Sequence, residues 1–183
     1  MSIVLVLSGC PAAGKSTFAS WLAGHHGFHW IDVEHDVPKM PREFQRVWGE
    51  TQAHPTPTNI AHWMQQLTWP RVIWDWSFAP GNWPVAEAIK AAGGVLWWFD
   101  APFDVARAKF AERGRGSVEE FDQQMSQICQ FTPQLTQVFA PNQLQTLLAN
   151  GQHLEPTVIY QAMAHTLPSG TTAINNNEGS PIP

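Results

Sequence analysis

The residues best suited to chemistry lie together near the start of the chain. Gly9-Cys10-Pro11-Ala12-Ala13-Gly14-Lys15-Ser16 fits the P-loop pattern G-x4-G-K-S. The glycines let backbone N–H groups wrap around phosphate oxygens, and a following helix adds the positive end of its dipole. The lysine supplies a cation for the β- and γ-phosphates, and the serine hydroxyl is a ligand for Mg²⁺. The segment from Gly9 to Thr17 is therefore predicted to bind a nucleoside triphosphate.

The setting of the P-loop indicates how the nucleotide is used. An apolar run, Ile3–Leu7, precedes it and is typical of a buried parallel strand, and a helical pattern runs from Ser16 to about His25. The sequence has no N-K-x-D motif, which argues against a GTPase, and 183 residues are few for a mechanical ATPase. A short chain with basic residues after the P-loop fits a kinase, whose late arginines close over the transferred phosphoryl group. We expect ATP and Mg²⁺ as cofactors.

Positive charge is scarce and gathered in a few places. The chain has 10 Lys and Arg against 15 Asp and Glu, and a net charge of −5. Eight of the ten basic residues are Lys15 and two groups at 39–46 and 107–115. A protein that coats nucleic acid without sequence preference is normally basic, so that role is disfavoured. The distribution favours a focused anion site, with solvated helix faces as the alternative.

The pattern is that of a cytoplasmic protein. Cys10 and Cys129 are the two cysteines and neither lies in C-x-x-C, which argues against a disulfide framework and a cysteine zinc site. No apolar run reaches the ~18–20 residues of a membrane span. The first ten residues look like a short lipoprotein signal, but no basic residue precedes Lys15 and the apolar run is brief. We expect no membrane association and no evident protein partner.

Strand-like and helix-like segments alternate along the chain. The predicted strands are 3–7, 28–31, 72–74, 95–99 and 144–148. The predicted helices are 16–25, 40–48, 59–67, 84–92, 102–113, 118–129 and 156–167, with a loop at 49–57. This alternation predicts a three-layer α/β P-loop NTPase fold with about five parallel strands and a small lid. Residues 1–167 are expected to form one kinase domain, and the polar segment 168–183 a disordered C-terminal tail.

Carboxylates follow two of the predicted strands. Asp32, Glu34 and Asp36 follow the strand at 28–31, and Asp75 closes the strand at 72–74. Because the carboxyl ends of parallel strands face the cleft of such a sheet, one of the first three is a candidate base for an acceptor hydroxyl. In an extended chain all three share one side, so the pattern does not choose among them. Asp75 is a candidate metal ligand with Ser16, with capping of the next loop as the alternative.

Other side chains are candidate substrate contacts. Arg113 lies in Arg-Gly-Arg-Gly, where glycines allow a hinge and a guanidinium suits a phosphoryl group; a plain helix end is the alternative. Arg42 is a candidate cation for the acceptor, and Trp76 a ring that stacks on its base or sugar. Asp100, before Ala101-Pro102, is interpreted as a helix cap rather than a ligand.

The chain resembles a family of small P-loop kinases. Leu7–Thr17, with its Cys-Pro pair, is similar to the P-loop of 5′-polynucleotide kinases and of their zeta-toxin-like and gluconate-type relatives. Segments 27–34 and 71–75 resemble two strands of that family that end in carboxylates. Segments 98–102 and 112–114 resemble its fourth strand with a D-x-P turn and its lid arginine. The resemblance runs from Ile3 to Cys129.

The resemblance implies roles for particular residues. It places the base that activates the acceptor at Glu34, an aspartate near metal and substrate at Asp75, and the lid arginine at Arg113. It also implies that the turn Gly151-Gln152-His153 lies beside the adenine.

The chain departs from the family after its second strand. The family usually has aspartate at the position of Glu34 and an arginine soon after, where this chain has Val37; the nearest basic residues are Lys39 and Arg42. We expect a kinase that phosphorylates a hydroxyl of a small acceptor, such as a nucleoside, nucleotide or sugar, or the 5′ end of a short oligonucleotide. A nucleotide-binding P-loop module without kinase activity is the alternative.

Overall fold

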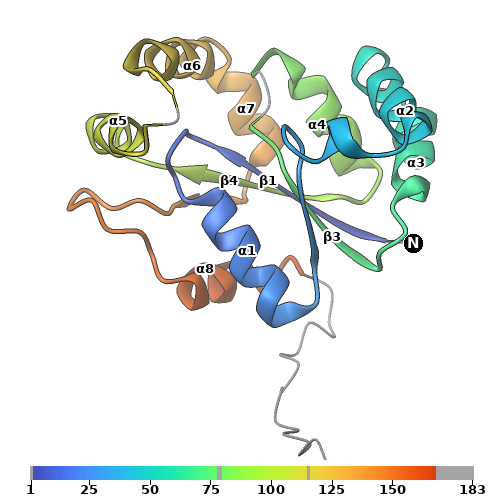
Figure 1. Cartoon of the computed structure of the whole chain (residues 1–183), viewed down its shortest axis with the longest axis horizontal. Helices are drawn as coiled ribbons and strands as arrows, with labels where there is room; N and C mark the ends of the chain where they lie inside the picture. Colours follow the sequence, from blue (N-terminus) through green and yellow to red (C-terminus); the bar gives the residue numbers. More distant parts are fainter. Residues whose placement is uncertain (1, 78–79, 115, 168–183) are drawn as a thin grey trace, which may run out of the picture.

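The core of the protein is one sheet of parallel strands. A computed structural model describes residues 2–77, 80–114 and 116–167. The sheet has five strands in the order β2-β3-β1-β4-β5 (Figure 1). The strands are β1 (Ile3–Gly9), β2 (His29–Asp32), β3 (Arg71–Asp75), β4 (Val95–Asp100) and β5 (Gln143–Gln145). The predicted three-layer α/β fold is confirmed.

Helices cover both faces of the sheet, which is why its central strands are apolar on both sides. On one face lie α1 (Lys15–His26) and α8 (Pro156–Met163) (Figure 1). The other face carries α2 (Arg42–Ala53), α3 (Pro57–Gln66), α4 (Trp83–Ala91) and α7 (Thr132–Phe139). Helices α5 (Phe103–Glu112) and α6 (Val118–Gln130) form a pair beyond the end of β4, and two short 3-10 turns span Val37–Lys39 and Pro80–Asn82.

The carboxyl ends of the strands bring the predicted site residues to one edge of the sheet. In the strand register, Asp75 lies opposite both Leu7 of β1 and Asp32 of β2, and Gly9 lies opposite Phe99 of β4. Strand β1 stands between β3 and β4, so the loop that follows it emerges where the strand order reverses. Open α/β sheets bind their ligands at this point.

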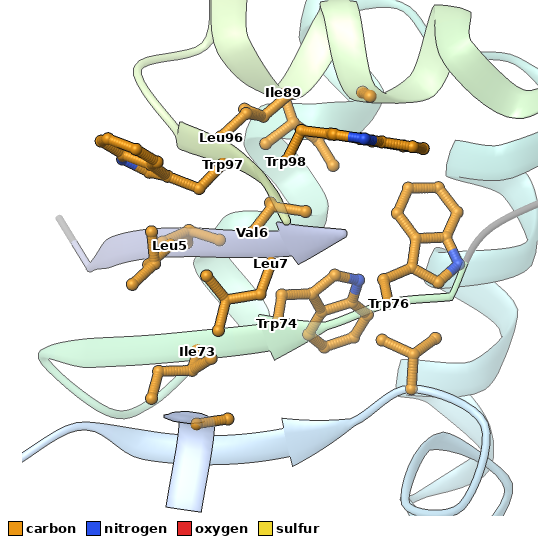
Figure 2. Packing of buried hydrophobic residues seen from close by; sticks show 14 of the residues in the cluster. Leu5, Val6, Leu7, Ile73, Trp74, Trp76, Ile89, Leu96, Trp97 and Trp98 are labelled. Carbon is orange, nitrogen blue, oxygen red and sulfur yellow. The ribbon is translucent and has the colours of Figure 1, made fainter. Parts of the chain in front are cut away.

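Four buried tryptophans pack α2 and α3 against the end of β3. Trp48 of α2 and Trp63 of α3 each pack on Trp74 with ring centroids 4.9 Å apart. Trp76, seen beside Trp74 in Figure 2, meets Trp48 at 5.3 Å. All four are at most 4% exposed. Edge-on aromatic pairs add about 0.5–1.5 kcal/mol each beyond the burial of their area, so this cluster makes a rigid wall behind Asp75.

The structure departs from the predicted elements in several places. Helix α2 runs to Ala53, into the predicted loop at 49–57, because Thr51 is buried and its Oγ1 donates to Val47 O at 2.8 Å. Helix α7 was not predicted. Strand β5 ends at Gln145, three residues before the predicted end at residue 148, because Leu147 turns back to bridge His153.

In the described parts of the chain, no helix is both long and apolar enough to cross a membrane. The cytoplasmic location expected from the sequence stays a prediction. The predicted tail at 168–183 lies outside the described residues.

Candidate active site

The P-loop has the backbone that its sequence pattern requires. Gly9 has φ +138°, and a Cβ there would overlap the carbonyl oxygen of Phe99 on β4. Gly14 has φ +86°, and a Cβ there would lie 2.9 Å from His153 Nδ1. Both positions therefore demand glycine. Helix α1 starts after Gly14 without a side-chain cap, so its first N–H groups face the P-loop as an anion-binding end.

Lys15 is folded against this loop and is only 7% exposed. Its Nζ donates to the carbonyl oxygens of Gly9 at 3.2 Å and Cys10 at 3.0 Å. Burial lowers the pKa of Lys15, and the Asp75 carboxylate opposes that shift. A buried ammonium group that has only neutral carbonyl partners is stabilised when it binds the β- and γ-phosphate oxygens of a triphosphate.

Asp75 is a buried carboxylate beside the P-loop. It is 4% exposed, and its Oδ2 has no hydrogen-bond partner among the described residues. Burial raises the pKa of Asp75, while a side-chain hydrogen bond from Ser16 and the charge of Lys15 lower it. The carboxylate and the serine hydroxyl are the hard oxygen donors that Mg²⁺ prefers. These residues therefore fit the metal that the P-loop implies.

Phosphates and water would complete the coordination of that metal. Within the described residues, no group of three or more His, Cys, Asp or Glu side chains is placed to hold an ion. Mg²⁺ bound with a nucleotide commonly uses one or two protein oxygens together with phosphates and waters, so Ser16 and Asp75 are enough.

The three carboxylates after β2 have different surroundings. Asp32 Oδ1 accepts from the N–H groups of Glu34 at 3.1 Å and His35 at 3.2 Å. Asp36 Oδ2 accepts from the N–H of Asp32 at 2.9 Å. These two therefore build the turn. Burial and the Asp32 charge raise the pKa of Glu34, and its charge also interacts with Lys15 and Asp75. Asp75 is affected by the charge of Asp32 as well, so the role of Glu34 as the base stays a prediction.

Arg113 is the C-cap residue of helix α5. It is exposed, and its charge acts on Lys15 and on His153. Gly114 follows with φ +60°, a left-handed conformation that suits glycine at a hinge. Arg107 of α5 holds α6 through two hydrogen bonds to Asp122, at 2.8 and 2.9 Å. The lid role of Arg113 stays a prediction.

The segment after β5 packs against the P-loop. Thr146 is 1% exposed and donates its Oγ1 hydrogen to Ala13 O at 2.6 Å. His153 packs against Gly14. Burial and the charges of Arg113 and Lys109 lower the pKa of His153. Sequence reasoning missed Thr146, whose signal was a polar residue inside the predicted strand at 144–148.

A hydrogen bond from a thiol to a carboxylate joins the P-loop to the end of β4. Cys10 Sγ donates to Asp100 Oδ1 at 3.0 Å, and the Ala101 N–H donates to the same oxygen at 2.9 Å. Burial, followed by the hydrogen bond to Asp100, raises the pKa of Cys10 to about 12, so the thiol keeps its proton. The interpretation of Asp100 as a helix cap is wrong, because α5 follows Pro102 and has no side-chain cap.

The two candidate acceptor contacts differ in exposure. Arg42 begins α2 and is exposed. Trp76 directly follows Asp75, but it is 4% exposed and packs on Trp48. Trp76 is thus part of the core as well as a neighbour of Asp75. Contact of either residue with an acceptor stays a prediction.

Comparisons with known proteins identify solved structures that have the same fold. No protein-family model and no curated protein matches the sequence. Shikimate kinase from Acinetobacter baumannii, solved in complex with shikimate, matches with a TM-score of 0.57 and 18% identity, over 92% of this chain and 97% of that one. The chain has the P-loop NTPase fold of the shikimate kinases.

Two other solved structures share this fold. Shikimate kinase from Bacteroides thetaiotaomicron has a TM-score of 0.55 at 16% identity, over 89% of this chain and 96% of that one. The Deinococcus radiodurans tunicamycin resistance protein has a TM-score of 0.55 at 16% identity, over 94% and 98%. The finer resemblance to polynucleotide and zeta-toxin-like kinases stays a prediction.

Proposed function

We propose that this P-loop protein is a kinase that transfers the γ-phosphoryl group of ATP to a hydroxyl of a small acceptor. The observation that carries the proposal is the pair of buried charges at the P-loop, Lys15 and Asp75, beside a strand end that supplies the candidate base Glu34. Nucleotide binding needs the P-loop, whereas transfer to a hydroxyl also needs a base beside it. Solved structures with this fold that are named as shikimate kinases support an acceptor of similar size.

In the proposed reaction, the acceptor oxygen bonds to the γ-phosphorus, the bond from that phosphorus to the β,γ-bridging oxygen breaks, and ADP leaves. Glu34 accepts the proton of the hydroxyl, and its raised pKa suits a base. Lys15 and the P-loop N–H groups hold the phosphates. The Arg113 guanidinium stabilises the negative charge on the phosphoryl group during its transfer. Ser16 and Asp75 would hold Mg²⁺, which neutralises phosphate charge when bound.

A nucleotide-binding module without kinase activity is the second candidate. Val37, 8% exposed, stands where the family that the sequence resembles carries an arginine. Glu34 likewise stands in place of the usual aspartate. Such a module would bind ATP at Lys15 and turn over no acceptor.

ADP release across a panel of nucleosides, sugars, short oligonucleotides and antibiotics with free hydroxyls separates the two candidates. For a kinase, at least one acceptor raises ADP release, and Lys15→Ala abolishes it. Lys90→Ala is the matched control, since Lys90 Nζ also donates to two backbone carbonyls, those of Val138 and Ala140 at the end of α7. ATP binding without acceptor-dependent release would favour the module, and absence of ATP binding would refute both candidates.

A further inference from the structure

A cavity between the β4–β5 edge and helices α6 and α7 lies beside the candidate active site. It has a volume of about 140 Å³. Its lining includes the apolar side chains of Trp98, Ile128 and Leu135 and the polar side chains of Asp100 and Gln143. A cavity of about 150 Å³ in another protein holds one benzene molecule, so this space matches a single small ring in volume.

Among the described residues, the lining of this cavity carries a negative charge and no positive charge. Asp100 is the charged residue of the lining, and in the described parts of the chain no cation forms an ion pair with it. Helices α6 and α7 and strand β5 supply none, because the sequence has no Lys or Arg after residue 115. On neighbouring α5, Arg107 is engaged by Asp122, and Lys109 by Glu112. A carboxylate in this position attracts an external cation.

Trp98 and Asp100 together provide two kinds of contact that bind an organic ammonium, an aromatic ring and a carboxylate. Alternate residues of a strand project to the same face, so both side chains point to the α7 side of β4. Trp98 packs edge-on against Phe139 of α7, with centroids 5.2 Å apart, which fixes its ring. An aromatic ring gives cation–π attraction and a carboxylate gives charge-assisted hydrogen bonds.

We propose that this cavity binds a small primary amine. Its ammonium lies between Trp98 and Asp100, and its apolar part lies against Ile128 and Leu135. Asp100 also accepts a hydrogen bond from the Cys10 thiol of the P-loop, so the amine site is joined to the nucleotide loop through this hydrogen bond. Binding to the nucleotide-free protein tests this site whether or not the protein is a kinase.

Benzylamine and benzyl alcohol are suitable probes because they match in size and ring but differ in charge. In calorimetry, we expect a Kd for benzylamine at least about tenfold lower than for benzyl alcohol, since hydrogen bonds to charged groups are the stronger ones. In ¹³C methyl NMR spectra, benzylamine should shift the signals of Ile128 and Leu135.

Three variants test the placement. Asp100→Asn keeps an acceptor for the Cys10 thiol and should remove most of the preference for the amine. Thr136→Phe adds a ring at an exposed lining position and should block both probes. Asp104→Asn, an exposed carboxylate on α5, is the control and should bind like the parent.

Several results would overturn the proposal: no saturable binding of benzylamine, equal affinity for both probes, or unchanged binding by Thr136→Phe. A folded Asp100→Asn variant that keeps the amine preference would do the same. Circular dichroism checks that each variant is folded, and Thr136→Phe decides the matter if Asp100→Asn does not fold.

Discussion

The proposed acceptor base, Glu34, can be distinguished from its neighbours by single substitutions. Glu34→Gln keeps the size of the side chain and removes its basicity, so kcat should fall by about 10²-fold or more while the Kd for ATP is unchanged. Asp36→Asn should lower kcat much less, because Asp36 accepts from the N–H of Asp32 within the turn and an asparagine oxygen can still accept that hydrogen bond. Steady-state kinetics and calorimetry make the comparison. The reverse ranking would move the base to Asp36.

The choice among these carboxylates could not be made from the sequence alone. Alternation places Asp32, Glu34 and Asp36 on one side only if the chain stays extended. Strand β2 ends at Asp32, and the next residues form a turn held by Asp32 and Asp36. The P-loop was predictable because its pattern is local, whereas the thiol of Cys10 and its partner Asp100 are 90 positions apart.

His153 should make nucleotide affinity depend on pH. In the nucleotide-free protein, burial and the charges of Arg113 and Lys109 hold its pKa below 6.5. A triphosphate on the P-loop brings negative charge next to this ring, so binding should raise the pKa and take up protons. Affinity for ATP should therefore increase, relative to His153→Gln, as the pH falls below 6.5.

The comparison with His153→Gln cancels the titration of ATP itself. Calorimetry in two buffers of different ionisation enthalpy counts the protons taken up on binding. The same proton uptake in both proteins would remove His153 from the nucleotide site.

At the scale of elements, helices and strands with a strong burial pattern could be predicted, and α7 could not. It has eight residues and contains Pro133, so it offers little periodic signal. In the structure the proline occupies the first turn, where it disturbs no helical hydrogen bond, and Leu135, Val138 and Phe139 form the buried face. This helix provides one wall of the proposed amine cavity.

The segment after β5 should support the P-loop through one buried hydroxyl. Thr146→Val keeps the shape of the side chain but leaves Ala13 O without the Thr146 hydrogen. We expect a loss of about 1–3 kcal/mol in the free energy of unfolding together with weaker nucleotide binding, because the P-loop is no longer held. Urea unfolding and ATP titration measure the two effects.

Thr51→Val is the matched control for this test. Thr51 is equally buried, and its Oγ1 donates to Val47 O within α2, away from the P-loop. The Thr51→Val variant should lose stability and keep the affinity of the parent protein for ATP. Equal weakening of ATP binding in both variants would mean that Thr146 acts through general stability.

On the scale of the whole molecule, the charge distribution bears on the acceptor. The basic group at 39–46 is the cluster outside the P-loop and the predicted lid segment. Arg46 is paired with Glu43 and Glu50, and Lys39 lies 3.6 Å from Asp36. Arg42 forms no ion pair within the described residues. The protein therefore offers little positive surface to a long polyanion.

This distribution predicts weak and only mildly salt-dependent binding of oligonucleotides. Each phosphate neutralised on a single strand contributes about −0.7 to the slope of log K against log salt concentration. Even if Lys39, Arg42 and Arg46 all exchanged their partners for phosphates, the slope would be about −2. Binding of a ten-nucleotide strand at several salt concentrations, beside turnover of nucleosides and sugars, measures this. Tight binding with a slope well beyond about −3 would contradict a small acceptor and favour a polynucleotide 5′ end, because it would need more cations than this surface holds.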